Sequence, residues 1–201
     1  MYISFRTAAL AAAVCWSQTC VAQDTYSNQT LGFSITKPKS WHYVTAEQNK
    51  ENLSRADFSD PKFKELVLQY ARTPFFAITK YKEPHDDLNP SIKVNVREAG
   101  QLKSMPPEKI AELTSTSLAR AFKDFALAEG PKAVTISGRP AGYFKANYTF
   151  EAGGSSWRTT SEMWIVPRGD LLFIIGAGLR EDEKNGSSKE LRSVVDTIKI
   201  Q

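Results

Sequence analysis

Cysteine is almost absent from this 201-residue chain, and the two cysteines that occur, Cys15 and Cys20, both lie near the N-terminus. If that segment is removed, the remaining chain has none. This excludes a disulfide framework, a thiolate metal site and a cysteine nucleophile. Long hydrophobic runs are lacking as well. No apolar stretch after residue 22 approaches the ~20 residues of a membrane-spanning helix, so we expect no transmembrane segment.

The first 22 residues have the three parts of a secretory signal peptide. Arg6 is their only charged residue, an apolar core runs over Thr7–Trp16, and Cys20–Ala22 offers small residues to a signal peptidase. We therefore expect cleavage near Ala22 and a mature chain that begins at Gln23. The residues before the two cysteines fit a lipoprotein anchor poorly. The protein is thus expected to be soluble and either periplasmic or secreted.

Neither sign of charge is in large excess. The chain has 26 basic and 22 acidic residues, and removal of Arg6 leaves 25 basic residues. Both signs are interspersed, which is typical of a solvated surface and not of a nucleic-acid footprint, so we expect no nucleic-acid binding. Residues 23–201 suit one domain, which would bury roughly 70% of the surface that its unfolded chain exposes.

The first half of the mature chain predicts a hairpin, a helix and two strands. Phe33 and Ile35 alternate with polar residues, as in a half-buried strand, and a hairpin ending near Pro38 leads to an aromatic anchor at Trp41. Residues 45–59 are expected to form a loop with a short helix. Strands are expected over 75–81 and 91–96. Between the loop and the first of these strands, Asp60-Pro61 should begin a helix with four apolar residues on one face: Phe63, Leu66, Val67 and Tyr70.

The second half predicts one long helix, four strands and a last helix. The long helix is expected to begin at Pro106-Pro107 and to end near Ala126. Strands are expected over 133–137, 142–150, 157–166 and 171–179, joined by hairpin turns. Ser187 and Glu190 match a capping box that begins the last helix, and 198–200 forms a final strand. The buried stripe of the long helix should hold Ile110, Leu113, Ser117, Leu118, Ala121, Phe122 and Phe125.

These elements predict an α+β fold. We expect an α/β/α sandwich with a central antiparallel sheet, the long helix on one face and the C-terminal helix on the other. No internal repeat or linker divides the chain.

One stretch of this pattern resembles a known family. The motif Gly32-Phe33-Ser34-Ile35-x-x-Pro38-x-x-Trp41 is similar to the hairpin that opens PsbP-like and DcrB-like domains. The turn over 137–141 and the terminal helix that runs into 197–200 are similar too. The resemblance implies a single PsbP/DcrB-like domain over residues 23–201, in a superfamily that includes photosystem accessory subunits and uncharacterised exported bacterial proteins. The shared motifs are structural, so they assign no functional residue.

No pattern in the chain indicates a catalytic, cofactor-binding or metal site, and we assign none. His85-Asp86-Asp87 offers metal-ligand side chains, but three consecutive residues do not converge easily on one ion. A polar loop is the better interpretation. His42 lies between two aromatic residues and is expected to pack against them. Ser34 and Lys37 match S-x-x-K by letters but lie on a predicted strand, whereas the catalytic motif begins a helix.

Three other short motifs have simple structural interpretations. Gly176-Ala177-Gly178 is too short for a dinucleotide loop, Glu181-Asp182-Glu183 is expected to form a solvated loop, and Arg168-Gly169-Asp170 a hairpin turn. The strand aromatics are mostly expected in the core, and an outward-facing subset would line a shallow groove. These aromatics are Tyr143, Tyr148, Phe150, Trp157 and Trp164.

Two classes of function remain open. The first is an exported, non-enzymatic accessory or binding protein of the bacterial envelope, a monomer or weak dimer that presents a sheet face or loop to a protein partner or small ligand. A stress-response role in envelope integrity falls within it. The second is a hydrolase or lyase whose site is assembled from scattered polar residues: His42, Asp57, Asp60, His85 and Asp86.

Overall fold

The computed structural model describes residues 24–62, 64–65 and 75–201. The strands of these residues are β1 (Asp24–Asn28), β2 (Phe33–Lys37), β3 (His42–Tyr43), β4 (Ala56–Asp57), β5 (Phe76–Thr79), β6 (Ser91–Glu98), β7 (Lys123–Ile136), β8 (Arg139–Ala152), β9 (Ser155–Arg168), β10 (Leu171–Arg180) and β11 (Lys199–Ile200). The helices are α1 (Ala46–Ser54), the 3-10 helix η1 (Gly100–Ser104), α3 (Pro107–Ala121) and α4 (Ser188–Val195).

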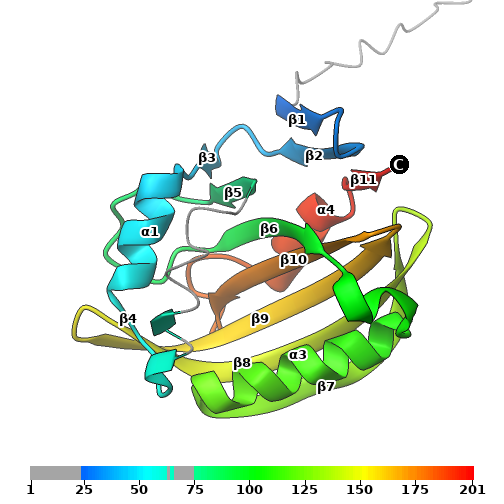
Figure 1. Ribbon diagram of the computed structural model, residues 1–201. Helices are drawn as coiled ribbons and strands as arrows, with labels where there is room; N and C mark the ends of the chain where they lie inside the picture. The colour runs from blue at the N-terminus through cyan, green and yellow to red at the C-terminus, as the bar shows by residue number, and fades with distance from the viewer. Residues whose placement is uncertain (1–23, 63, 66–74) are drawn as a thin grey trace, which may run out of the picture.

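The strands form two antiparallel sheets (Figure 1). The larger sheet has the order β3-β5-β6-β10-β9-β8-β4, with β7 also paired to β8, and the smaller has the order β1-β2-β11. Tight turns join the long strands. Gly153 and Gly154 between β8 and β9 have φ of 57° and 80°, the positive values that a two-residue type I′ turn requires. The expected α+β class is confirmed, and the hairpin and turns lie where the sequence predicts them.

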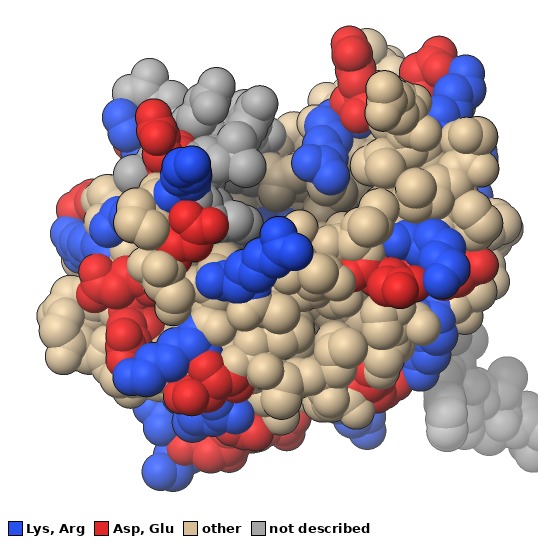
Figure 2. All heavy atoms as spheres, turned by 60° about the horizontal axis from the view of Figure 1, so that its bottom comes forward, with Lys and Arg blue, Asp and Glu red and all other residues tan. Residues whose placement is uncertain are grey.

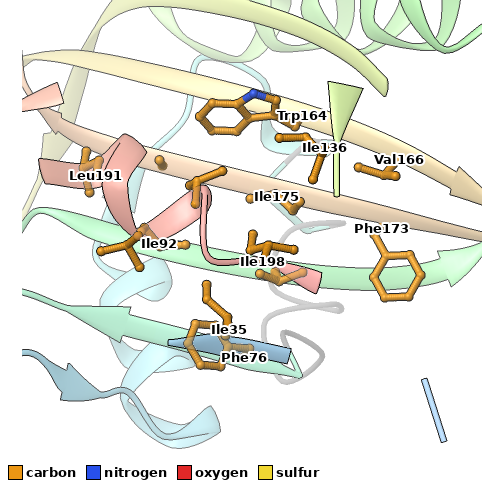
Figure 3. Close-up of a cluster of buried hydrophobic side chains, with 14 of the residues drawn as sticks. Ile35, Phe76, Ile92, Ile136, Trp164, Val166, Phe173, Ile175, Leu191 and Ile198 are labelled. Carbon is orange, nitrogen blue, oxygen red and sulfur yellow. The ribbon is translucent and has the colours of Figure 1, made fainter. Parts of the chain in front are cut away.

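Alternation along the strands gives the large sheet two different faces. On one face, Trp164, Ile175 and Ile92 pack with Ile35 of β2 and Leu191 of α4 (Figure 3). Trp41 joins this core with 2% of its surface exposed, and its indole nitrogen donates to Glu190 Oε1 at 3.2 Å. The expected aromatic anchor is confirmed.

The other face carries α3, which runs beside β7 and β8 near the bottom of Figure 1. Ile110 and Ala111 of α3 pack with Phe144, Ile165 and other residues of the sheet. The helix approaches very closely at Gly142, where an added Cβ would lie 2.0 Å from the Pro107 carbonyl oxygen. Glycine at that position is therefore what allows α3 to begin directly on β8.

The prediction for the end of the long helix is wrong. The helix ends at Ala121, Phe122 has extended backbone with φ −115° and ψ 136°, and β7 begins at Lys123, so Phe125 and Ala126 are strand residues. Local helix propensity is a weak prior that tertiary pairing overrides. Here β7 pairs with β8 along most of its length, and that ladder takes the residues expected in the last helical turn.

The predicted buried stripe of α3 is wrong in part. Leu113 is 51% exposed and Ser117 is exposed, whereas Ala111 and Ser115 are buried beside Ile110. Small residues face the sheet because α3 lies so close to it. The helix is thus rotated so that Ala111 and Ser115 face the sheet and the larger Leu113 faces solvent.

The region expected to be mostly loop contains α1 and β4. Thr45 caps α1, with a full capping box formed by Thr45 and Gln48. The next predicted helix begins as expected, because Asp60 Oδ1 accepts from the backbone nitrogen of Lys62 at 2.9 Å and the described residues over 61–65 are helical. Its four expected apolar residues, Phe63, Leu66, Val67 and Tyr70, lie outside the described residues.

At the start of the last helix, one of the two hydrogen bonds of the expected capping box is present. Ser187 Oγ accepts from the backbone nitrogen of Glu190 at 3.1 Å. The Glu190 carboxylate instead pairs with Lys80 at 2.8 Å and accepts from Trp41. It therefore ties α4 to the residue before β3 and to the residue after β5, and does not cap the helix.

Candidate binding groove

The α3 face of the large sheet is only partly covered by α3. Beyond the helix, the described residues line a cavity of about 600 Å³. Small-molecule sites commonly fall in the range of about 300–1,000 Å³ and are lined mostly by apolar side chains. We refer to this cavity as the groove. It is lined by parts of β6, β8, β9 and β10, by the end of α3 and by the loop before β6.

Small side chains form the floor of the groove. Strand pairing places Ala146, Ser161, Gly178 and Ser91 side by side across four strands. Gly176 lies two residues before Gly178 in β10 and faces the same way, because Ile175 and Ala177 belong to the opposite core. A Cβ at Gly176 would have no atom of the described residues within 4 Å. Gly176 therefore leaves its part of the groove floor open, whereas a Cβ at Gly178 would lie 3.3 Å from Ser161 Oγ.

Aromatic side chains form much of its wall. The Tyr148 ring lies 4.2 Å from that of Phe122 and 6.4 Å from that of Phe125, between ring centroids. Phe150 and Trp157, a cross-strand pair, stack at 6.4 Å. Such rings supply large apolar contact areas at little cost in side-chain entropy. The wall therefore suits an apolar or aromatic ligand.

The strands also contribute hydroxyl groups to the groove lining, from Ser91, Tyr148, Ser155, Thr159 and Ser161. The Tyr148 hydroxyl bonds to the Ser161 hydroxyl at 2.8 Å. Burial raises the pKa of Tyr148, an effect that its hydrogen bond with Ser161 partly opposes. This hydroxyl pair remains neutral near pH 7, so it can donate or accept a hydrogen bond without adding charge.

Lys93 is the basic residue that the sheet contributes to the groove. It is partly buried, and pairs in register with Gly176 of β10. Burial lowers the pKa of its ammonium group to about 8, against the opposing effect of the Glu83 carboxylate. Its ammonium forms no hydrogen bond or ion pair within the described part of the chain.

The loop before β6 forms the rim. Asn89 holds its two ends together, since its side chain accepts from the backbone nitrogen of Tyr81 and donates to the Tyr81 carbonyl. Asp87 anchors the loop through an ion pair with Arg180 at 2.9 Å. His85 stacks on Tyr81 with ring centroids 4.7 Å apart. His85 Nε2 is buried, with no hydrogen-bond partner among the described residues.

The structure brings together only two of the five polar residues considered for an enzyme. His85 and Asp86 line the groove. His42 is exposed on β3 opposite Thr79, Asp57 is exposed on β4, and Asp60 begins a helix. These three are not among the described residues that line the groove.

The S-x-x-K pair is structural. Ser34 lies in β2, paired with β1 and β11. The Lys37 ammonium donates to the Trp41 carbonyl at 2.9 Å and pairs with Asp24 at 3.2 Å. Its ammonium is thus held by the turn that it closes.

The five strand aromatics divide between the two faces. Tyr143 and Trp164 belong to the core beneath α4, whereas Tyr148, Phe150 and Trp157 line the groove. Sequence reasoning did not assign Lys93, Phe122, Phe125 or Gly176 to a site. The one available signal was glycine at alternate positions of a strand, which often marks a close approach or an open space.

The described residues give no sign of a membrane span or metal centre. None of the helices they form combines the length and apolar character that a membrane crossing demands. Across 24–62, 64–65 and 75–201, the side chains of His, Cys, Asp and Glu do not gather in a group of three that could hold a metal ion. Basic and acidic side chains are interspersed on the face seen in Figure 2.

Comparison with solved structures shows a shared fold. The chain is similar to LpqN of Mycobacterium tuberculosis, described as involved in cell envelope biogenesis, with 13% identity, a TM-score of 0.50 and coverage of 91% of this chain and 87% of that one. It is also similar to the cyanobacterial PsbP protein CyanoP of Synechocystis sp. PCC 6803, with 12% identity, a TM-score of 0.53 and coverage of 93% and 97%. No family model matches the chain, and no curated protein matches it.

At these identities the likeness establishes the fold and not the activity. The chain has the PsbP-like fold that its opening motif predicts.

Proposed function

We propose that the protein is an exported, non-enzymatic binding protein of the bacterial envelope that holds an apolar small ligand in the groove. One observation carries the proposal: a cavity of about 600 Å³ with an open glycine floor and an aromatic wall. LpqN, which has the same fold, is described as involved in cell envelope biogenesis, and this supports an envelope role.

The proposal includes the organisation of the chain. Residues 1–22 act as the signal peptide, and residues 23–201 form one PsbP/DcrB-like α/β/α sandwich, with α3 and α4 on opposite faces of the large sheet. Finding Gln23 as the first residue of the protein recovered from the periplasm supports export. An intact Met1 in that fraction contradicts it.

A hydrolase or lyase is less well supported. General acid–base catalysis needs groups positioned within hydrogen-bond reach of one reacting centre. Of the five candidates, only His85 and Asp86 line the groove, and His85 is stacked on Tyr81. A ligand-binding role is supported by the lining of the whole groove, whereas an enzymatic role is supported by only two candidate residues at its rim.

The test is a titration of the purified protein, expressed with its own N-terminal segment, with the neutral fluorescent probe N-phenyl-1-naphthylamine. We expect saturable enhancement of probe fluorescence with one site per chain. Trp157 lines the groove, so energy transfer from tryptophan to the probe should fall in Trp157→Phe. Absence of saturable binding, or an equal fall in a Trp41→Phe control, contradicts the proposal.

A further inference from the structure

We propose that Lys93 binds the acidic group of the ligand, and that the ligand is therefore an amphiphile with an apolar body and a single carboxylate, as in a long-chain fatty acid. This inference rests on the proposed function. It specifies the chemical class of the ligand and the residue that selects it.

Lys93 lies where an anionic group can reach it from inside the groove. It is the cross-strand neighbour of Gly176, which has no side chain, and the row continues to Met163 and Phe144. The space beside the lysine stem is therefore left vacant by glycine and bounded by apolar residues. A ligand lying on this floor meets the ammonium at one end and apolar side chains along the rest.

Lys93 also lacks the partners that other basic residues near the groove have. Arg180 pairs with Asp87 and Asp182, and Arg55, which follows α1 and also lines the groove, pairs with Glu51. The Lys93 ammonium has no such counterion among the described residues. A partly buried charge without a counterion is costly. An incoming carboxylate would offset that cost through a charge-assisted hydrogen bond.

The charges around Lys93 favour a ligand with one negative charge. Glu83, Asp86 and Asp87 also line the groove, and Glu83 acts electrostatically on Lys93. Such carboxylates would repel a dianionic phosphate more strongly than a monoanion. One cation is enough to balance the charge of a carboxylate, and the sheet supplies that cation as Lys93.

The test compares lauric acid with 1-dodecanol, which has the same chain without the charge. Each should displace N-phenyl-1-naphthylamine from the purified full-length protein at pH 7, with lauric acid below its critical micelle concentration and 1-dodecanol below its solubility limit. A hydrogen bond to a charged group contributes enough that lauric acid should bind about 10-fold tighter or more. In Lys93→Met, this preference should disappear while 1-dodecanol binds at least as well as before. Lys199→Met, at an exposed position of β11, should keep the preference.

The outcomes separate the two proposals. Equal affinity of the native protein for lauric acid and 1-dodecanol overturns the role of Lys93 but leaves apolar binding intact. Equal weakening of both ligands in Lys93→Met overturns it too. If neither ligand nor the probe binds, the proposed function itself fails. The comparison in the native protein needs no variant, so it remains decisive even if Lys93→Met does not fold.

Discussion

Gly176→Val should close the groove without harming the fold. Gly176 lies in the middle of β10, faces the groove, and leaves room for a Cβ among the described atoms. Glycine within a strand costs roughly 0.5–1 kcal/mol relative to alanine, and valine is favoured in strands. We therefore expect the free energy of unfolding to be unchanged or higher by up to about 1 kcal/mol.

Binding should respond in the opposite direction. The valine methyl groups would occupy the floor between Lys93 and Met163, where a ligand must lie. Forcing extra methyl groups into an occupied site costs about 1–3 kcal/mol, which corresponds to about 5- to 150-fold weaker binding. Gly130→Val is the matched control, because Gly130 lies in β7 outside the groove and a Cβ there also has no described atom within 4 Å.

Urea denaturation and N-phenyl-1-naphthylamine titration measure the two quantities. A stable Gly176→Val protein with native probe affinity would refute the assignment of this floor to ligand binding. A variant that unfolds, while Gly130→Val does not, would refute the claim that space is open at Gly176.

Two further predictions concern stability. Because folding lowers the pKa of Lys93 to about 8, its desolvation cost is fully present below pH 8 and vanishes as pH rises to about 10.5, where the unfolded lysine also loses its proton. Lys93→Met should therefore raise the free energy of unfolding at pH 7 by up to about 3 kcal/mol. This gain in stability should disappear by about pH 10.5. A gain that urea titrations find to be independent of pH would contradict this prediction. Gly142→Ala should lower the free energy of unfolding by about 1–3 kcal/mol or more, because its Cβ would lie 2.0 Å from the Pro107 carbonyl oxygen; an unchanged thermal midpoint would count against the close approach.

Local patterns predicted much of the fold. The alternation in β2 and β6, the tight turns between the long strands and the Ser187 cap depend on neighbours in the sequence. The end of α3 does not depend on sequence neighbours, because the residues after Ala121 are held by pairing with β8. A helical periodicity continues through that segment, and only the tertiary ladder overrides it.

The groove was harder to predict for a related reason. Alternation in β6 places Lys93 on the face opposite Ile92, but it does not indicate whether solvent, a helix or a cavity lies there. That depends on strand order, which brings Lys93 beside Gly176 and Ser91 beside Gly178. Phe122 and Phe125 join the wall only because α3 ends early. The sequence places Gly176 and Gly178 in a strand, but their effect on the sheet surface depends on the strand pairing.

The most direct test of the groove is to map ligand contacts in solution. Amide chemical shifts of the ¹⁵N-labelled protein are recorded during titration with N-phenyl-1-naphthylamine. Ligand binding should shift the amides of Ser161, Gly176 and Gly178 strongly and leave those of β1, β2 and β11 in place. Saturable shifts confined to the small sheet or to α4 would place the ligand elsewhere and contradict the assignment of this groove.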